Sequence, residues 1–202
     1  MTPVQRGHDK DDEIVERELP KHWIRPGERL LFGCAPIRGY VAARIGTDFR
    51  LPYEPLGPVP ELDLGRCRWP LPADVEPDHW TDDPTVAFVV EAAHAEQQAV
   101  RLGDHLAHSR GEARLVLTSH RVAVIYTTRL FHTPAPGEPL FQTFAEQPSG
   151  SVLGYSAPYA GRSVPPVQII RVDFTDGSTL MLRDPLAGRR VGRARSRQSQ
   201  PR

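Results

Sequence analysis

The chain has 202 residues, and its 25 acidic and 25 basic side chains give a formal net charge of zero. Without an excess of basic charge, the composition gives no reason to expect a specific nucleic-acid partner. The length suits one domain with insertions, and the 21 prolines, about twice the usual share of roughly 5%, indicate long segments outside any sheet.

Neither a membrane span nor a secretory leader is indicated. No apolar stretch approaches the length of about 18 residues that crosses a bilayer, and the first residues lack a basic segment followed by an apolar run. We therefore expect a cytoplasmic protein without a transmembrane segment. Cys34 and Cys67 are then better interpreted as free or buried thiols than as a disulfide, and the sequence does not show whether they lie near each other.

The N-terminal 18 residues are polar and charged. Residues 9–18 hold six acidic side chains: Asp9, Asp11, Asp12, Glu13, Glu16 and Glu18. We expect 1–18 to be a disordered acidic segment, followed by a single domain over 19–186. Within that domain Pro26-Gly27 predicts a turn and 29–35 a strand. Residues 38–46 fit a second strand or a short helix, and we favour a strand paired with the first.

Residues 52–77 contain nine Pro or Gly in 26 positions, which predicts a long loop insertion. The pattern then changes, because Gly103 is the sole Gly or Pro between Pro84 and Ser109. Apolar side chains recur there at a period near 3.6: Phe88, Ala92, Ala95, Ala99, Leu102 and Leu106. The spacing predicts one long amphipathic helix over 84–109, packed on a sheet and ended by Gly111.

After Gly111 the pattern becomes that of strands. Residues 113–117 and 122–127 are short and rich in β-branched side chains, and the polar residues 118–121 stand between them. Residues 134–166 hold eleven Pro or Gly in 33 positions and are predicted as a second Pro-rich loop. Two further strands, 167–174 and 179–183, are joined by Asp176-Gly177, a strong hairpin signal because the turn needs positive φ.

Two of these stretches resemble a known family. "GEARLVLTSHRVAVI" has an apolar run, Leu-Thr-x-x-Arg and a second apolar run, and "IIRVDFTDGSTLMLR" has a strand, an Asp-Gly turn and a strand. Together they are similar to bacterial pleckstrin-homology-like and GRAM-like domains. The matching positions are Leu117, Thr118, Arg121, Phe174, Asp176 and Gly177, with Ser119 where Asn is common. The resemblance implies a strongly curved antiparallel sheet or partial barrel closed by a helix.

The fold class expected is therefore α+β, a curved antiparallel sheet with one long packed helix and Pro-rich loops. In such a fold residues 118–121 form chiefly a hairpin corner, in which Thr118 and Ser119 hydrogen-bond to nearby backbone. A ligand contact by Arg121 and His120 is the alternative. We expect Arg121 to stack or pair with a neighbouring side chain.

Metal and enzyme signatures are weak. Glu91 and His94 form Glu-x-x-His, and Asp104, His105 and His108 follow on the same expected helix. A helical metal site needs such a motif on two helices, and only one long helix is predicted. Because Gly-x-Ser-x-Gly, His-Glu-x-x-His and phosphate-binding glycine loops are missing from the sequence, we expect no metal, no cofactor and no catalytic residues.

The C-terminal residues 187–202 are predicted to be a disordered, Arg-rich tail. Its candidate contacts to an anionic partner are Arg189, Arg190, Arg193, Arg195 and Arg197. The leading hypothesis for the whole chain is a non-enzymatic binding or scaffolding module for another protein. The alternatives are peripheral attachment to anionic membrane lipid through the tail, and an enzyme of unrecognised type.

Overall fold

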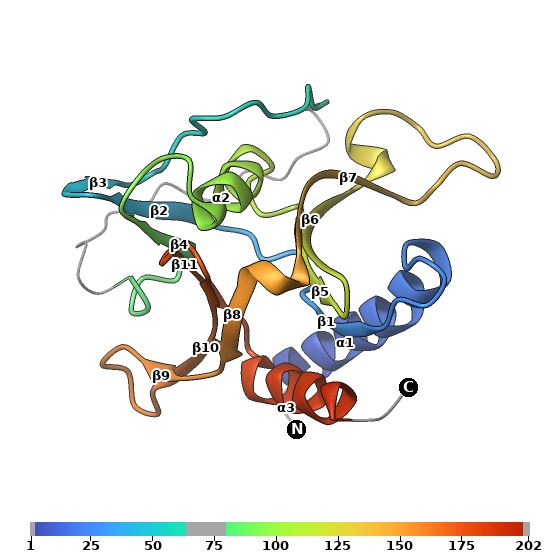
Figure 1. Ribbon diagram of the computed structural model, residues 1–202. Coiled ribbons are helices and arrows are strands. Elements are labelled where there is room, and N and C mark those ends of the chain that lie inside the picture. The colour runs from blue at the N-terminus through green and yellow to red at the C-terminus, as the bar shows by residue number, and fades with distance from the viewer. Residues whose placement is uncertain (1–2, 64–79, 200–202) are drawn as a thin grey trace.

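The computed structural model describes residues 3–63 and 80–199, which form two β-sheets surrounded by helices (Figure 1). The smaller sheet aligns β1 (Leu30–Gly33), β5 (Arg114–Thr118), β6 (Arg121–Thr127) and β7 (Phe141–Pro148). The larger sheet aligns β3 (Asp48–Arg50), β2 (Tyr40–Ile45), β4 (Val86–Ala92), β11 (Thr179–Arg183), β10 (Val167–Phe174) and β8 (Val152–Ser156). The short β9 (Tyr159–Ala160) pairs with β10. The fold is therefore α+β, as the sequence predicts, and the described strands do not close into a barrel.

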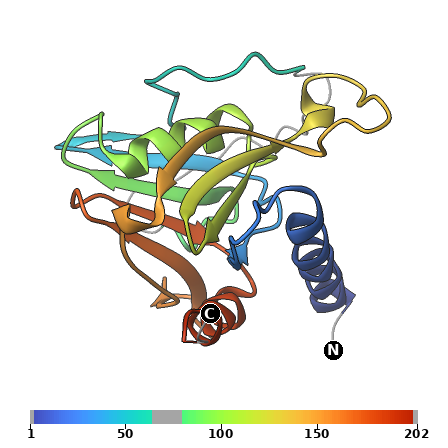
Figure 2. The ribbon, with the colours of Figure 1, turned by 45° about the vertical axis from the view of Figure 1, so that its right-hand side comes forward.

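One bent segment joins the two sheets. β7 pairs with β6 up to Pro148, a 3₁₀ turn η4 (Ser149–Ser151) follows, and β8 then pairs with β10. A seam lies between β8 and β1, which is the other edge strand of the smaller sheet. Helix α3 (Ala187–Gln198) lies along this seam and contacts β1, β8 and β10. Helix α2 (Gln98–His108) packs on β2, β4, β6, β7 and β11, across both sheets (Figure 2).

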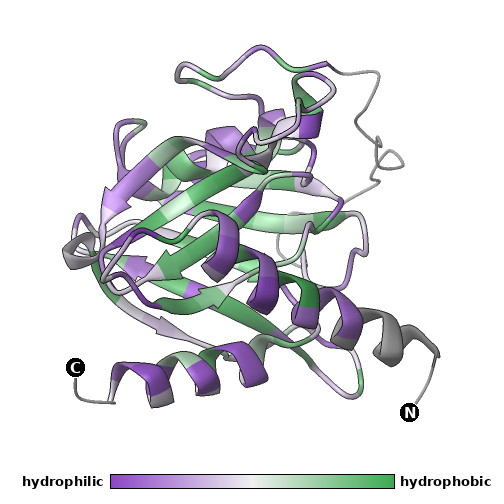
Figure 3. Ribbon diagram, turned by 90° about the vertical axis from the view of Figure 1, so that its right-hand side faces the viewer, coloured by the Kyte–Doolittle hydropathy of each residue, from purple (hydrophilic) through white to green (hydrophobic). Residues whose placement is uncertain are grey.

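The main hydrophobic core lies between the two sheets and is completed by the two helices. Phe32 and Leu117 come from the smaller sheet, Val90 and Phe174 from the larger sheet, and Leu106 from α2. A second cluster places Val15 and Leu19 of α1 (Pro3–His22) against Val116 and Ile125 on the outer face of the smaller sheet. The strands are accordingly the apolar part of the molecule, whereas α1 and α3 are mostly hydrophilic (Figure 3).

The predicted helix over 84–109 is correct only in its second half. Val86–Ala92 is strand β4, whose residues 86–90 are buried on both faces, and α2 begins after Gln97. A short, continuous apolar run fits a buried strand as well as a helix.

The start of α2 carries no local side-chain cap. Its first amides instead donate to the hairpin turn after β10, Gln98 N to Asp176 Oδ2 at 2.7 Å and Ala99 N to Ser178 Oγ at 3.1 Å.

The other predicted elements divide similarly. Strands at 30–33, 114–118 and 121–127 and the Asp176-Gly177 hairpin are confirmed, with Gly177 at φ 83°. The strand within 38–46 is confirmed, but its predicted pairing with the first strand is wrong, because β2 pairs with β3 and, in parallel, with β4. The loop predicted over 134–166 contains β7, β8 and β9. Residues 52–63 hold no helix or strand, and 64–77, with Cys67, lie outside the described residues.

Residues 3–22 and 187–198 form helices α1 and α3, although the segments predicted to be disordered, 1–18 and 187–202, include most of these residues. Each end carries an excess of one charge, a pattern typical of solvated segments. The acidic segment and the Arg-rich segment instead pair with each other: Arg190 of α3 and Asp12 of α1, 178 positions apart, are joined by a 2.6 Å hydrogen bond. The sequence shows the two opposite charges but not that they meet.

The pairing is carried by three side chains on one side of α3, Arg190, Arg193 and Arg197, here called the arginine row. Arg190 and Asp12 are 2% and 1% exposed, and Arg190 also lies 2.8 Å from Asp184. Arg193 donates two 2.7 Å hydrogen bonds to Asp12. Burial would raise the pKa of Asp12, but the hydrogen bond from Arg193 and the nearby arginine charges outweigh it and lower that pKa.

The arginine row also covers the open edge of β1. Arg190 donates to the carbonyl of Gly33, and Arg197 donates to those of Leu30 at 3.3 Å and Leu31 at 3.2 Å. Arg197 in addition pairs with Glu16 of α1. Backbone carbonyls at a sheet edge need hydrogen-bond donors when water is excluded. The arginine row therefore links α1, α3 and the edge of β1 in one network.

We expect Asp12→Asn to lower the free energy of unfolding by about 3 kcal/mol, because it leaves the buried Arg190 without one of its two carboxylate partners. Urea denaturation measures this loss. Asp11→Asn, an identical change at the adjacent exposed residue, is the control and should change stability by less than about 0.5 kcal/mol. Equal losses in the two variants would contradict the proposed importance of the buried pair.

Two glycines in helices should respond oppositely to alanine. A Cβ on Gly103 of α2 would lie 2.5 Å from Cγ2 of Val90 on β4, whereas a Cβ on Gly192 of α3 meets nothing within 4 Å. Gly103→Ala should therefore destabilise the fold by about 1–3 kcal/mol through overpacking. Gly192→Ala should stabilise it by up to about 1 kcal/mol through helix propensity. Thermal denaturation compares them, and a stabilising Gly103→Ala would show that α2 does not pack so closely on β4.

Candidate functional site

The corner, residues 118–121, is a tight connection held by side-chain hydrogen bonds. Thr118 is buried, and its Oγ1 accepts from the backbone N–H groups of Arg121 at 3.0 Å and His120 at 3.2 Å. Ser119 Oγ accepts from the Arg29 N–H at 3.0 Å, and the Ser119 carbonyl accepts from Ser149 Oγ at 3.0 Å. The corner thus fixes the start of β1 and the η4 turn to the end of β5.

Arg121 of the corner is directed into the protein. Its side chain is 6% exposed, its Nε donates to Glu28 at 2.9 Å and its Nη1 to Glu146, and its guanidinium lies 3.9 Å from the ring centre of Trp23. These contacts match the expectation that Arg121 stacks or pairs nearby. They also occupy the guanidinium N–H groups through which Arg121 would bind a ligand. His120, in contrast, is exposed at the tip of the turn.

The two carboxylates around Arg121 have lowered pKa values. Burial opposes ionisation of Glu28 and of Glu146, but in both cases the hydrogen bond and charge of Arg121 outweigh it. The ion-pair cluster is therefore fully charged at neutral pH. It joins the turn before β1 to the β6 and β7 strands.

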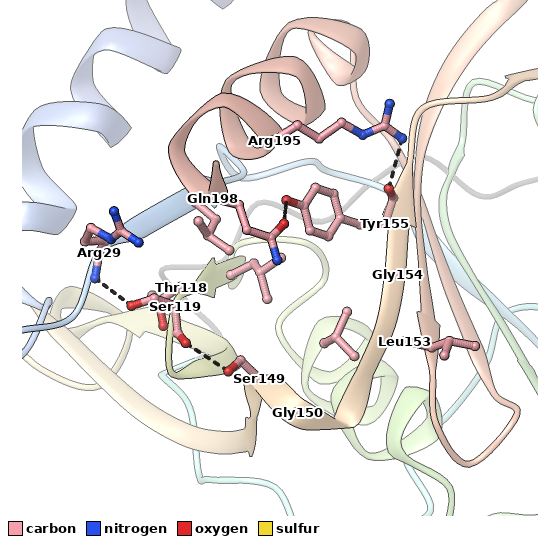
Figure 4. Close-up of a pocket in the computed structure, with 13 residues that line it drawn as sticks. Arg29, Thr118, Ser119, Ser149, Gly150, Leu153, Gly154, Tyr155, Arg195 and Gln198 are labelled. Carbon is pink, nitrogen blue, oxygen red and sulfur yellow. Dashed lines mark hydrogen bonds between the residues drawn. The ribbon is translucent and has the colours of Figure 1, made fainter. Parts of the chain in front are cut away.

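A cavity borders the corner at Thr118 and Ser119. It has a volume of about 520 Å³ and opens along the seam between β1 and β8, below the C-terminal turn of α3 (Figure 4). We call it the seam groove. The residues that define it are Arg29, Leu31, Leu117, Ser119, Ser149, Val152, Tyr155, Arg195 and Gln198.

The seam groove combines an apolar floor with a polar, positively charged rim. Leu31 and Leu117 are buried, whereas Arg195 and Gln198 of α3 are exposed. Within the described part of the chain, no Asp or Glu lines the groove. The Tyr155 hydroxyl donates to Gln198 Oε1 at 2.8 Å, and burial raises the Tyr155 pKa despite the charge of Arg195. The groove therefore favours ligands with negative charge beside an apolar group.

Strand β8 presents backbone to the groove. The Tyr155 carbonyl accepts a long, 3.5 Å hydrogen bond from Arg195, so it points away from β10 and toward α3. In an antiparallel strand the N–H and C=O of one residue point to the same side. Two residues earlier a bulge interrupts the pairing with β10 and leaves Leu153 75% exposed. The outer edge of β8 is thus irregular but accessible.

The five tail arginines named in the sequence do not act as one surface. Arg190, Arg193 and Arg197 form the paired arginine row, Arg195 lines the seam groove, and Arg189 is exposed on α3. Sequence reasoning missed the rest of the groove. Ser149, Val152 and Tyr155 fell within the predicted loop, and Arg29 gave no signal at all, because only the bend after β7 brings these residues together.

The residues considered for a metal site are dispersed. Glu91 lies on β4 and His94 in the following turn, while the buried His105 hydrogen-bonds to the Tyr126 hydroxyl at 2.8 Å. Asp104 accepts from the Tyr53 hydroxyl at 2.6 Å and from Gly57 N at 2.9 Å. Among the described residues, no group of three or more His, Cys, Asp or Glu side chains could hold a metal ion.

In comparisons with known proteins, no family model matches the chain, and neither a curated protein nor a solved structure matches it. The resemblance to pleckstrin-homology-like domains therefore stays a prediction. Of the helices in the described residues, none has the length and apolar character needed to cross a bilayer.

The cluster around Arg121 predicts acid sensitivity. The pKa values of Glu28 and Glu146 are lowered on folding from the ordinary 4.5, so the stabilisation is complete well above pH 4.5 and is lost as the pH falls through the folded-state values. Glu28→Gln should weaken the fold at pH 7 and flatten the pH dependence between about pH 6 and 3, measured by urea denaturation. Glu61→Gln, at an exposed site, should leave both unchanged. A Glu28→Gln curve parallel to wild type would contradict this assignment.

Proposed function

We propose that this protein is a non-enzymatic binding or scaffolding module for another protein, built on a frame of the pleckstrin-homology-like kind. The bend at η4, the hairpin corner at 118–121 and the C-terminal helix at the seam support that frame. The observation that carries the proposal is the seam groove itself. An elongated site between two sheet edges, with an apolar floor and an accessible strand edge, suits an extended protein segment.

The chemistry of the groove favours binding over catalysis. Its hydroxyls are engaged with protein atoms: Ser149 donates to the Ser119 carbonyl, and Tyr155 donates to Gln198. An activated nucleophile needs an adjacent base, and the described lining residues include no His, Asp or Glu. The same lining supplies two arginines, one side-chain amide and apolar contacts, which are the groups of a recognition surface.

Attachment to anionic lipid through the C-terminal arginines is less well supported. Such attachment needs cationic side chains gathered on one solvent-facing surface. The arginine row is directed instead toward Asp12, Glu16 and the edge of β1. A protein partner at the seam groove needs none of these pairs to break.

Site-specific photocrosslinking tests the proposal. A benzophenone side chain at position 198, on the exposed rim of the groove, should capture a discrete partner from an extract of the source organism. Placed at position 164, where Val164 is 96% exposed and not part of the groove, it should not. The identified partner, once purified, should bind the protein directly.

A blocking variant sharpens this test. Gly150 also lines the groove, and a Cβ added to it meets nothing within 4 Å. Gly150→Phe therefore adds a bulky side chain at the groove and should abolish capture at position 198, with circular dichroism verifying that the variant is folded. The same adducts from positions 198 and 164, or capture that survives Gly150→Phe, would overturn the seam groove as the binding site.

A further inference from the structure

The seam groove carries one sign of charge. Arg29 approaches it from the residue before β1 and Arg195 from α3, and no acidic side chain among the described residues lines it. Figure 4 shows Arg195 on the α3 side of β8 and Arg29 on the opposite side of the cavity. Arg195 is exposed and lines the groove, so its positive charge is available to a ligand there. Carboxylates are the complementary groups.

The floor between the two arginines is apolar. Leu31 and Leu117 present buried side chains there, and Val152 borders them from β8. Leu153 of β8 also lines the groove and is 75% exposed, so a ligand that places carboxylates against the arginines can bury an apolar group against it. A segment with an apolar side chain flanked by acidic residues meets both demands.

Arg195 connects charge recognition to the strand edge. Its guanidinium is exposed and holds the Tyr155 carbonyl through a hydrogen bond of 3.5 Å, a length at which such bonds are weak. A carboxylate forms a stronger, charge-assisted bond with a guanidinium. An acidic ligand therefore draws Arg195 away from the carbonyl and leaves the outward backbone groups of Tyr155 open to an added strand.

We infer that the seam groove binds an extended acidic segment of a partner protein, with an apolar residue on the floor and its backbone beside β8. This rests on the proposed function and specifies its ligand. Arg195 is the specificity-determining residue, since its guanidinium pairs with the carboxylates of an acidic segment and repels a basic one.

Fluorescence anisotropy with three labelled eight-residue peptides tests the inference. The first peptide carries an apolar pair flanked on each side by two acidic residues, the second has lysines in place of the acids, and the third has serines in place of the apolar pair. The first should bind most tightly and weaken with added salt. Arg195→Glu should weaken its binding at least about tenfold, through like-charge repulsion.

Two further variants control for folding and for total charge. Gln198→Glu keeps an oxygen that accepts from Tyr155 and adds a negative charge to the rim, so it should also weaken binding while retaining the fold. Arg162→Glu makes the same change of charge as Arg195→Glu at an exposed site outside the groove, and it should bind as wild type does. Circular dichroism verifies that each variant is folded.

The possible outcomes are distinct. Equal binding of the acidic and lysine peptides, or equal effects of Arg162→Glu and Arg195→Glu, would overturn the inference. Capture at position 198 without binding of the acidic peptide would reject acidic specificity while the proposed function stands. If neither capture nor peptide binding occurs and phosphatidylserine vesicles bind in an Arg195-dependent way, both the inference and the proposed function are wrong.

Discussion

The buried contact between Arg190 and two carboxylates, Asp12 and Asp184, is the interaction on which the rest of the structure depends. A guanidinium that is 2% exposed is stable in the interior only when its charge is paired. Here Nη1 donates to Asp12 of α1 and to the carbonyl of Gly33 on β1, and Nε lies 2.8 Å from a carboxylate oxygen of Asp184, in the segment after β11, without a hydrogen bond between them. The contacts of this one side chain form only when α1 and α3 are both folded, and they bring the two helices to the same edge of the smaller sheet.

This arrangement also determines where the seam groove lies. The bend between β7 and β8 leaves a seam between β1 and β8. In the part of the seam nearest α1, the arginine row contacts the edge of β1. The C-terminal turn of α3 extends beyond those pairs, and there Arg195 and Gln198 border the seam groove. Within one helix, then, three arginines pair with other parts of the fold, and another, Arg195, lines the seam groove.

The sequence predicted the parts of this structure that are encoded locally. The Asp176-Gly177 turn, the strands beside the corner and the strand at β2 follow from residue types within a few positions. The failures share one cause, which is dependence on distant residues. The start of α2 is capped by Asp176, the acidic and basic ends pair with each other, and the buried run of β4 has the same local pattern as a helix. For the site, the sequence indicates Arg195 as a contact to an anionic partner. Other residues that line the groove, on η4 and β8, lie in the segment that is predicted to be a loop.

Amide hydrogen exchange over residues 3–22 and 187–198 tests the buried pairing of the two ends most directly. If Arg190 holds α1 and α3 against the edge of β1, the amides of residues 12–22 and 190–198 should exchange at least about a hundred times more slowly than in an unfolded chain, and both segments should lose protection together when Asp12 is replaced. Exchange of either segment at the rate of an unfolded chain would contradict the pairing and, with it, the position of Arg195 at the groove.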